Sequence, residues 1–168
     1  MRTHAVIDSV VGSLTLVADD GAIVGLYMDS QRHRPADDHL GDPEPRGREA
    51  EPFKTAVDQL DAYFAGRLTR FDLPLAPVGS VFQQRVWAAL QEIPFGQTES
   101  YGELAERIGS PGGARAVGLA NGKNPIGIII PCHRVVGADG SLTGYGGGLD
   151  RKKLLLDLET RVGGAALF

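Results

Sequence analysis

Hydrophobic and polar residues alternate along the first part of the chain, and a two-residue period is typical of half-buried strands. The alternation covers residues 4–8, 14–18 and 23–28, with breaks at Gly12 and at residues 19–21. Because the breaks contain glycine or aspartate, which favour turns, the pattern predicts three strands joined by tight turns. Residues 70–75 form a candidate fourth strand.

A helical period follows the three strands. Apolar residues recur at three- to four-residue spacing from Phe53 to Phe64, and Gly66 is a typical helix end. Residues 30–52, which precede this helix, are rich in charge and proline and contain almost no large apolar side chain, so they predict a mobile surface loop. The sequence thus predicts an α/β N-terminal domain over residues 1–76, a small antiparallel sheet plus a helix, acting as a scaffold.

The second half of the chain has mainly helical patterns. Capping boxes, in which a serine is followed three residues later by Gln or Glu, are predicted at Ser80–Gln83 and Ser100–Glu103. A third helix is expected near residues 112–122, and the short glycine-containing turn before it is typical of a helix-turn-helix. A last helix is expected over residues 150–159. We therefore predict a mostly α C-terminal domain over residues 80–168 with a winged-helix-like helix-turn-helix.

The most distinctive chemistry lies at Cys132-His133, because Cys132 is the only cysteine of the chain. The isoleucine-rich residues 124–130 predict a short buried strand that ends at Pro131. Neighbouring side chains of a strand face apart, so the thiol and the imidazole can cooperate only if the chain bends at Pro131. The pair is either a nucleophile with its base or a small buried hydrophobe beside a surface histidine.

Composition and charge narrow the class of protein. A length of 168 residues with 42% hydrophobic residues is that of an ordinary globule, and no apolar run has the length of a membrane span. One cysteine excludes an internal disulfide and a Cys-rich zinc site, so a cytoplasmic protein without metal or other cofactor is expected.

The net charge of −4 is unevenly distributed. Residues 1–79 hold 8 basic and 13 acidic groups, giving −5, and residues 80–168 hold 9 basic and 8 acidic groups, giving +1. No acidic residue lies between Glu106 and Asp139. The four cations in this stretch are Arg107, Arg115, Lys123 and Arg134. They predict either a local positive surface for DNA or a solvated face.

A group of motifs around Cys132 carries a resemblance to a known family. The run from Pro131 to Val136, preceded by Asn124-Pro125 and followed by the glycine-rich residues 144–148, resembles the O6-alkylguanine-DNA alkyltransferases, the methylated-DNA–protein-cysteine methyltransferases. Recognisable motifs cover residues 82–159. The resemblance implies direct-reversal DNA repair, in which an alkyl group passes from O6-alkylguanine, or O4-alkylthymine, in flipped-out duplex DNA to Cys132, irreversibly and in a single turnover.

The same resemblance implies a role for each catalytic candidate. Cys132 accepts the alkyl group, and His133 takes its proton through a water molecule. Glu159 orients His133, Asn124 braces the active-site turn, and Tyr101 hydrogen-bonds or protonates N3 of the departing base. These are the roles of nucleophile, base and orienting group found in catalytic triads, with the order changed.

The resemblance also implies how the protein meets double-stranded DNA. The third helix enters the minor groove, and Arg115 fills the place of the extruded base. The other implied groove contacts are Ala114, Ala116, Gly118, Asn121 and Lys123. The implied substrate pocket consists of Val135, Tyr145, Gly146 and Gly147. Without the resemblance, the small residues of this helix equally predict close helix–helix packing. The protein is expected to act as a monomer, and whether molecules cooperate on DNA is left open.

Two other functions compete with alkyl transfer. The first is non-catalytic damage sensing by an alkyltransferase-like protein, although such relatives lack the cysteine. The second is a cysteine hydrolase that uses Cys132 and His133, although no evident oxyanion loop accompanies them.

Overall fold

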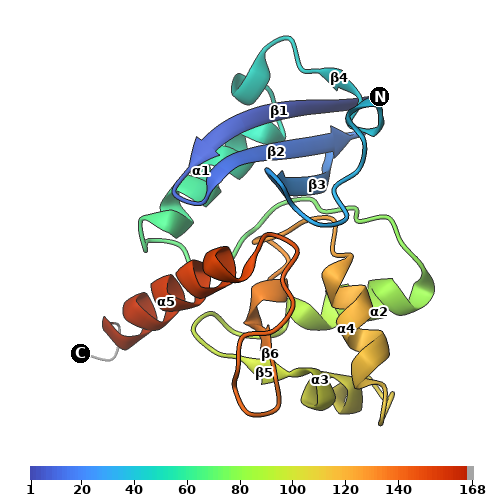
Figure 1. Cartoon of the computed structure of the whole chain (residues 1–168). Helices are drawn as coiled ribbons and strands as arrows, with labels where there is room; N and C mark the ends of the chain where they lie inside the picture. The colour runs from blue at the N-terminus through green and yellow to red at the C-terminus, as the bar shows by residue number, and fades with distance from the viewer. Residues whose placement is uncertain (166–168) are drawn as a thin grey trace.

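A computed structural model describes residues 1–165, which form two lobes in contact (Figure 1). The last three residues of the predicted C-terminal domain, 166–168, lie outside the described residues. The three predicted strands are confirmed as β1 (Arg2–Ser9), β2 (Gly12–Asp19) and β3 (Ala22–Met28), paired antiparallel. They form one sheet of order β3-β2-β1-β4.

The segment predicted as a mobile loop has short elements of its own. β4 (Asp42–Pro43) pairs parallel with β1. Two short 3-10 helices are also present, η1 (Asp37–His39) and η2 (Gly47–Glu49). The sheet is therefore mixed rather than purely antiparallel. The mobility of residues 30–52 stays a prediction.

Helix α1 (Phe53–Phe64) lies behind the sheet in Figure 1. Its buried face includes Phe53, Val57 and Leu60 as predicted, but it is Tyr63 and not Phe64 that is fully buried. Gly66, whose φ of +77° is easy only for glycine, follows the helix end.

The prediction of a strand at residues 70–75 is wrong, because only Leu75 forms a β-bridge, with Ile23. Pro74 and Pro77 have no N–H group, so this segment can donate few of the hydrogen bonds that a strand needs.

The second lobe contains α2 (Val81–Leu90), α3 (Tyr101–Arg107), α4 (Ala114–Gly122) and α5 (Leu149–Ala165). Both predicted capping boxes are present, at the starts of α2 and α3. Helices α3 and α4 form the helix-turn-helix, and the Trp87 indole of α2 donates a 2.9 Å hydrogen bond to the Ala120 carbonyl of α4. Strands β5 (Glu99–Ser100) and β6 (Val135–Val136) pair parallel in the same lobe. A small sheet domain and a helical C-terminal domain confirm the predicted fold class.

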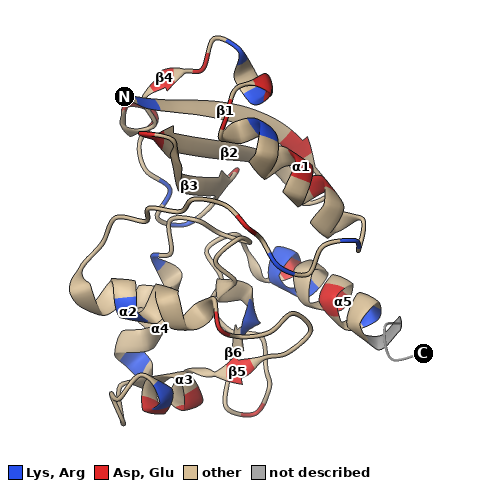
Figure 2. Ribbon diagram, turned by 180° about the vertical axis from the view of Figure 1, so that it is seen from behind, with Lys and Arg blue, Asp and Glu red and all other residues tan. Residues whose placement is uncertain are grey.

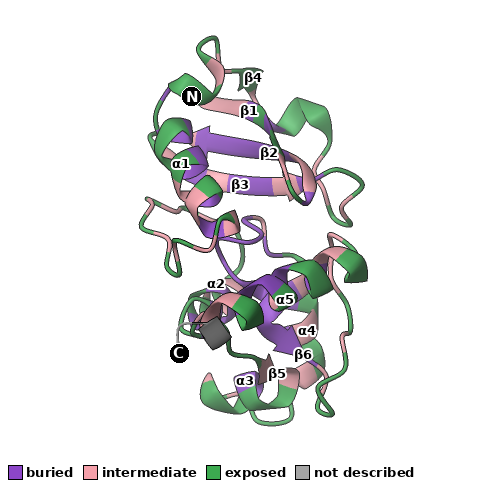
Figure 3. Ribbon diagram, turned by 90° about the vertical axis from the view of Figure 1, so that its left-hand side faces the viewer, coloured by how far each residue is buried: buried purple, intermediate pink, exposed green. Residues whose placement is uncertain are grey.

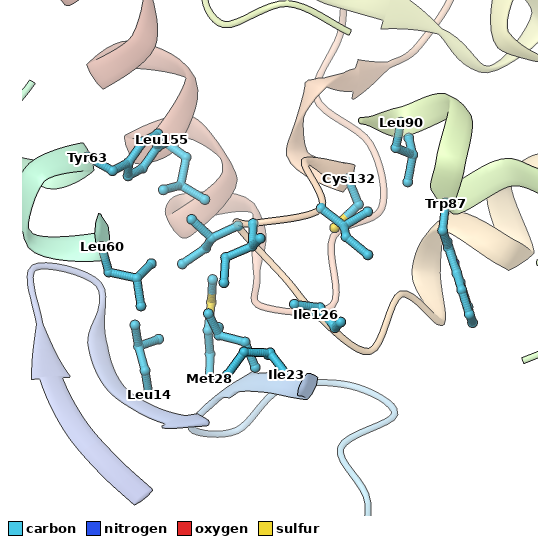
Figure 4. Packing of buried hydrophobic residues seen from close by; sticks show 14 of the residues in the cluster. Leu14, Ile23, Met28, Leu60, Tyr63, Trp87, Leu90, Ile126, Cys132 and Leu155 are labelled. Carbon is cyan, nitrogen blue, oxygen red and sulfur yellow. The ribbon is translucent and has the colours of Figure 1, made fainter. Parts of the chain in front are cut away.

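One hydrophobic core joins the two lobes. Figure 4 shows it running from Leu14 and Leu60 of the sheet lobe through Leu155 and Ile126 to the surroundings of Cys132. The burial colours of Figure 3 show the same continuity, with buried segments in both lobes and where they meet. The sheet lobe therefore supports the back of the Cys132 site, and the domain limits at residues 76 and 80 stay a prediction. Within the described chain, none of the helices is both long and apolar enough to cross a membrane.

Candidate active site

The segment before Cys132 is a coiled turn and not the predicted strand. Only Ile126 pairs, through a bridge to Leu26, and Ile128 has a φ of +70° that no strand residue adopts. The Asn124 side chain explains the coiling: its Nδ2 donates to the Ile130 carbonyl at 2.8 Å and its Oδ1 accepts from the Ile126 N–H at 3.0 Å. A side chain that bonds to nearby backbone in this way competes with strand pairing.

The expected bend at Pro131 is present, and it brings Cys132 and His133 into one 3-10 turn, η3 (Cys132–Arg134). Cys132 is buried, and the cavity beside it has a volume of about 10 Å³. Burial raises the pKa of the Cys132 thiol, while a hydrogen bond from Asn124 and the charge of Lys152 act against this rise. The resting site therefore favours a neutral thiol, and a nearby base is needed to ionise it.

His133 and Glu159 form a buried pair. Nε2 of His133 and Oε2 of Glu159 are 2.7 Å apart, and both side chains are at most 1% exposed. Burial lowers the pKa of His133, so the imidazole is neutral at pH 7. Its Nδ1 is buried and makes no hydrogen bond with the described part of the chain, which leaves it free to accept a proton.

Sequence reasoning missed two other partners of Glu159. The Tyr63 hydroxyl donates to Oε2 at 2.6 Å, and the Arg134 guanidinium donates Nε to Oε1 at 2.8 Å. Burial acts to raise the pKa of Glu159, but its bonds to His133 and Arg134 outweigh burial and lower the pKa to about 2. The carboxylate is therefore ionised at neutral pH and can orient His133. Tyr63 lies 96 residues from Glu159, so no local pattern indicated this contact.

Lys152 is a second residue that the sequence pattern did not single out. Its side chain is fully buried, and Nζ donates to the carbonyls of Val135 at 2.6 Å and Thr143 at 2.7 Å. Burial lowers the pKa of Lys152 to about 8. It joins the active-site turn to the glycine-rich loop over residues 144–148 and places a positive charge near Cys132.

Three of the four predicted pocket residues lie around the same cavity. Tyr145, Gly146 and Gly147 line it together with Cys132. Val135 is buried but is not among the residues that line the cavity. The Tyr101 hydroxyl donates to the Thr143 carbonyl at 3.1 Å. The structure thus brings Tyr145, Gly146 and Gly147 together beside Cys132, and Tyr101 contacts the same loop from α3.

Helix α4 presents part of the predicted groove surface. Arg115, Ala116 and Lys123 are exposed, and Ala114 and Gly118 are half-buried. The structure corrects the predicted groove contact of Asn121. This residue is buried, and its Nδ2 donates to the Cys132 carbonyl at 3.3 Å. It points inward because it lies on the face of the helix that packs on the active-site turn, so we reinterpret it as a positioning residue.

The predicted four-cation surface is smaller than expected. Arg107 bonds to Glu99 at 2.9 Å and to Glu92 at 3.3 Å, while Arg134 is buried against Glu159. Within the described residues, Arg115 and Lys123 have no carboxylate partner. Figure 2 shows basic residues on α2, α3 and α4, with acidic residues also present on α3.

Residues 1–165 contain no group of three His, Cys, Asp or Glu side chains that could hold a metal ion. Fold and site instead define a DNA-binding class of protein: a helix-turn-helix lobe carries a buried cysteine beside a hydrogen-bonded His–Glu pair.

Comparisons with known proteins specify the family. The ribonuclease-like domain of 6-O-methylguanine DNA methyltransferase matches residues 3–77, and the DNA binding domain matches residues 81–161. A methylated-DNA–protein-cysteine methyltransferase of Mycolicibacterium paratuberculosis is 56% identical over 168 residues, 99% of this chain and 98% of that protein. A protein of the same name from Methanosarcina acetivorans is 48% identical, over 93% and 97% of the two chains. The crystal structure of Mycobacterium tuberculosis OGT in complex with DNA has a TM-score of 0.86 at 55% identity, covering 95% and 94%.

The chain belongs to the 6-O-methylguanine DNA methyltransferase family. It is an enzyme of direct-reversal DNA repair, and this activity is favoured over the non-catalytic sensor. The resemblance stated from the sequence is thereby confirmed.

Proposed function

We propose that the enzyme transfers one alkyl group from O6 of an alkylguanine, or O4 of an alkylthymine, to Sγ of Cys132. The observation that carries this assignment is the buried 2.7 Å contact between His133 and Glu159 immediately beside the single cysteine. A neutral thiol with a raised pKa reacts slowly. An adjacent, oriented base can remove its proton and so produce the reactive thiolate.

The proposed step balances as a nucleophilic displacement at carbon. Sγ of Cys132 forms a bond to the alkyl carbon while the bond from that carbon to O6 breaks, and the electron pair of the broken bond leaves with the base. The thiol proton passes to Nδ1 of His133 through a water, and this Nδ1 makes no hydrogen bond with the described residues that would compete for the proton. The departing base takes up a proton, with Tyr101 as the proposed donor at N3.

The proposed DNA substrate is a duplex approached from its minor groove, with the protein acting as a monomer. Cys132 is 7% exposed, so a stacked base cannot reach it and must leave the helix. Exposed Arg115 and Ala116 on α4 support a groove-facing helix surface, on which Arg115 would occupy the vacated place in the stack. Val135 and the loop at Tyr145–Gly147 would hold the extruded base.

The thioether product explains why the reaction occurs once. Thiol exchange cannot cleave a thioether, and the chain has no second cysteine. A single cysteine that must stay reduced also supports the proposed cytoplasmic location.

Intact-protein mass spectrometry with peptide mapping tests the proposal. The protein is incubated with excess duplex that carries one O6-methylguanine. We expect the mass of one methyl group to appear on Cys132 and to stop at one equivalent. The Cys132→Ser variant should gain no mass, and Glu159→Gln should gain it more slowly. Tight DNA binding with no change in mass would instead establish the sensor function.

A further inference from the structure

The sheet lobe contributes a side chain to the cavity beside Cys132. Gln31, three residues after the end of β3, lines this cavity together with Asn124, Tyr145 and Gly146. It lies inside the segment that the sequence predicted to be a mobile loop, in a domain interpreted as a scaffold. The resemblance to the alkyltransferases implies no role for this position.

Backbone contacts fix the position of Gln31 on the glycine-rich loop. The neighbouring Arg32 N–H donates to the Gly146 carbonyl at 2.8 Å. Arg151 donates Nη1 to the Asp29 carbonyl at 2.7 Å and also pairs with the Asp29 carboxylate. The segment around Gln31 is therefore attached to the second lobe on both sides of this residue.

The side chain of Gln31 is also held in place. Its Oε1 accepts a 2.8 Å hydrogen bond from the Met28 N–H. Its Cγ would lie 3.5 Å from a Cβ built on Gly146, which is ordinary van der Waals contact. The methylenes of Gln31 therefore lie against the glycine-rich loop that lines the cavity, and the hydrogen bond from Met28 holds the side chain in this position.

The cavity that Gln31 helps to enclose is small. A volume of about 10 Å³ is room for roughly one water, which is close to the size of a methyl group. The extruded base and its alkyl group must therefore displace part of the lining, and a benzyl group, several times larger than a methyl group, must displace more of it. The space beside Gly147 is already filled, because a Cβ built there would overlap the sulfur of Met28.

We propose that Gln31 is a specificity-determining residue, whose side chain forms the outer wall of the alkyl pocket and favours small alkyl groups over bulky ones. This inference rests on the proposed alkyl transfer to Cys132. A close-packed wall discriminates by size, because each added methylene must displace atoms that are already in contact.

The experiment compares rates of Cys132 alkylation by duplexes that carry either O6-methylguanine or O6-benzylguanine in the same sequence. We expect Gln31→Ala to raise the benzyl-to-methyl rate ratio by about tenfold or more, since removing the wall releases space for the larger group. Gln31→Met keeps the bulk but loses the bond to Met28, and should keep the wild-type ratio. Gln59→Ala is the matched control, because Gln59 bonds to the Asp72 backbone far from the cavity.

Three results would contradict the proposed role of Gln31 in limiting the size of the alkyl group. An unchanged ratio in Gln31→Ala shows that the side chain does not limit size. Equal increases in Gln31→Ala and Gln31→Met show that the lost hydrogen bond, rather than bulk, controls the ratio. An equal increase in Gln59→Ala shows a general loosening of the sheet lobe. Gln31→Ser repeats the test if the alanine variant does not fold. Absence of methyl transfer in the wild type refutes the proposed function itself, which separates the two failures.

Discussion

Glu159 is the residue on which the polar part of the site depends. Its two carboxylate oxygens accept hydrogen bonds from Tyr63, His133 and Arg134, all at 3.0 Å or less. Because such bonds favour the ionised form, they keep the pKa of Glu159 near 2 although burial alone acts to raise it. A carboxyl that is ionised in the folded state and has an ordinary pKa in the unfolded chain makes stability depend on pH.

The sign of this dependence follows from the lowered pKa. The stabilisation from Glu159 is fully present above its ordinary pKa near 4.5 and is lost as the pH falls toward 2. It is on the order of 3 kcal/mol. We therefore expect the difference in unfolding free energy between the wild type and Glu159→Gln to shrink between pH 6 and pH 3, measured by urea denaturation.

Asp157→Asn provides the matched control on the same helix. Its carboxylate is exposed and bonds to Lys153, so the effect of its removal should be small at both pH values. A wild-type advantage over Glu159→Gln that stayed constant from pH 6 to pH 3 would contradict the ionised, hydrogen-bonded state of Glu159.

At the scale of elements, helix α4 is the part that should couple the protein to duplex DNA. Arg115 and Ala116 are exposed at its start, while Val117 and Ala120 pack inward. The exposed face combines the small Ala116 with two larger side chains, Arg115 and Leu119, and the groove that it is proposed to enter is only about 6 Å wide. If Arg115 takes the place of the extruded base, its loss should affect only substrates that must leave a duplex.

Replacing Arg115 by Ala should therefore separate two activities. Unstacking a base costs a few kcal/mol, so duplex repair should slow by about 10- to 100-fold. Reaction with free O6-benzylguanine, which needs no extrusion, should be nearly unchanged. Single-turnover rates with both substrates measure this, and Arg67→Ala, an exposed arginine of the other lobe, is the charge control. Equal slowing with both substrates would remove the proposed role of Arg115.

Local signals explain which elements could be predicted. The capping boxes at Ser80 and Ser100 and the three alternating strands involve residues close in sequence, and all are present in the structure. The isoleucines before Pro131 indicated a strand, but the Asn124 side chain bonds to the backbone there and coils it. The hydrogen bonds of this one side chain outweigh the strand propensity of the four isoleucines. These bonds are seen only in the folded segment, so the sequence pattern could not indicate them.

The rest of the site depends on how the two lobes meet, a feature of the whole molecule. The motif around Cys132 indicated the nucleophile and its base, because these residues are adjacent in the chain. Tyr63 and Gln31 reach the site from the sheet lobe, through contacts across a shared core. No periodicity or spacing connects them to Cys132, so the scaffold interpretation of that lobe was incomplete.

The charge of the whole molecule sets its attraction to DNA. The net charge is −4, and two of the four cations in the acid-free stretch are paired within the protein. Each phosphate contact contributes about −0.9 to the slope of log K against log salt concentration. Arg115 is assigned to the base stack, so Lys123 is the one cation of that stretch assigned to a phosphate, and we expect a shallow slope of about −1, measured by fluorescence anisotropy with a labelled duplex.

Variants of the two kinds of cation test this assignment directly. Lys123→Ala should make the slope shallower by about 1, since Lys123 is exposed and is expected to meet a phosphate. Arg107→Ala should leave the slope unchanged, because Arg107 already neutralises Glu99 and Glu92. A slope near −4 that becomes shallower in Arg107→Ala would mean that DNA draws this arginine out of its ion pairs. The predicted four-cation surface would then form only when DNA is bound. The attraction to DNA, despite a net charge of −4, would come from arginines released from their ion pairs rather than from a fixed positive surface.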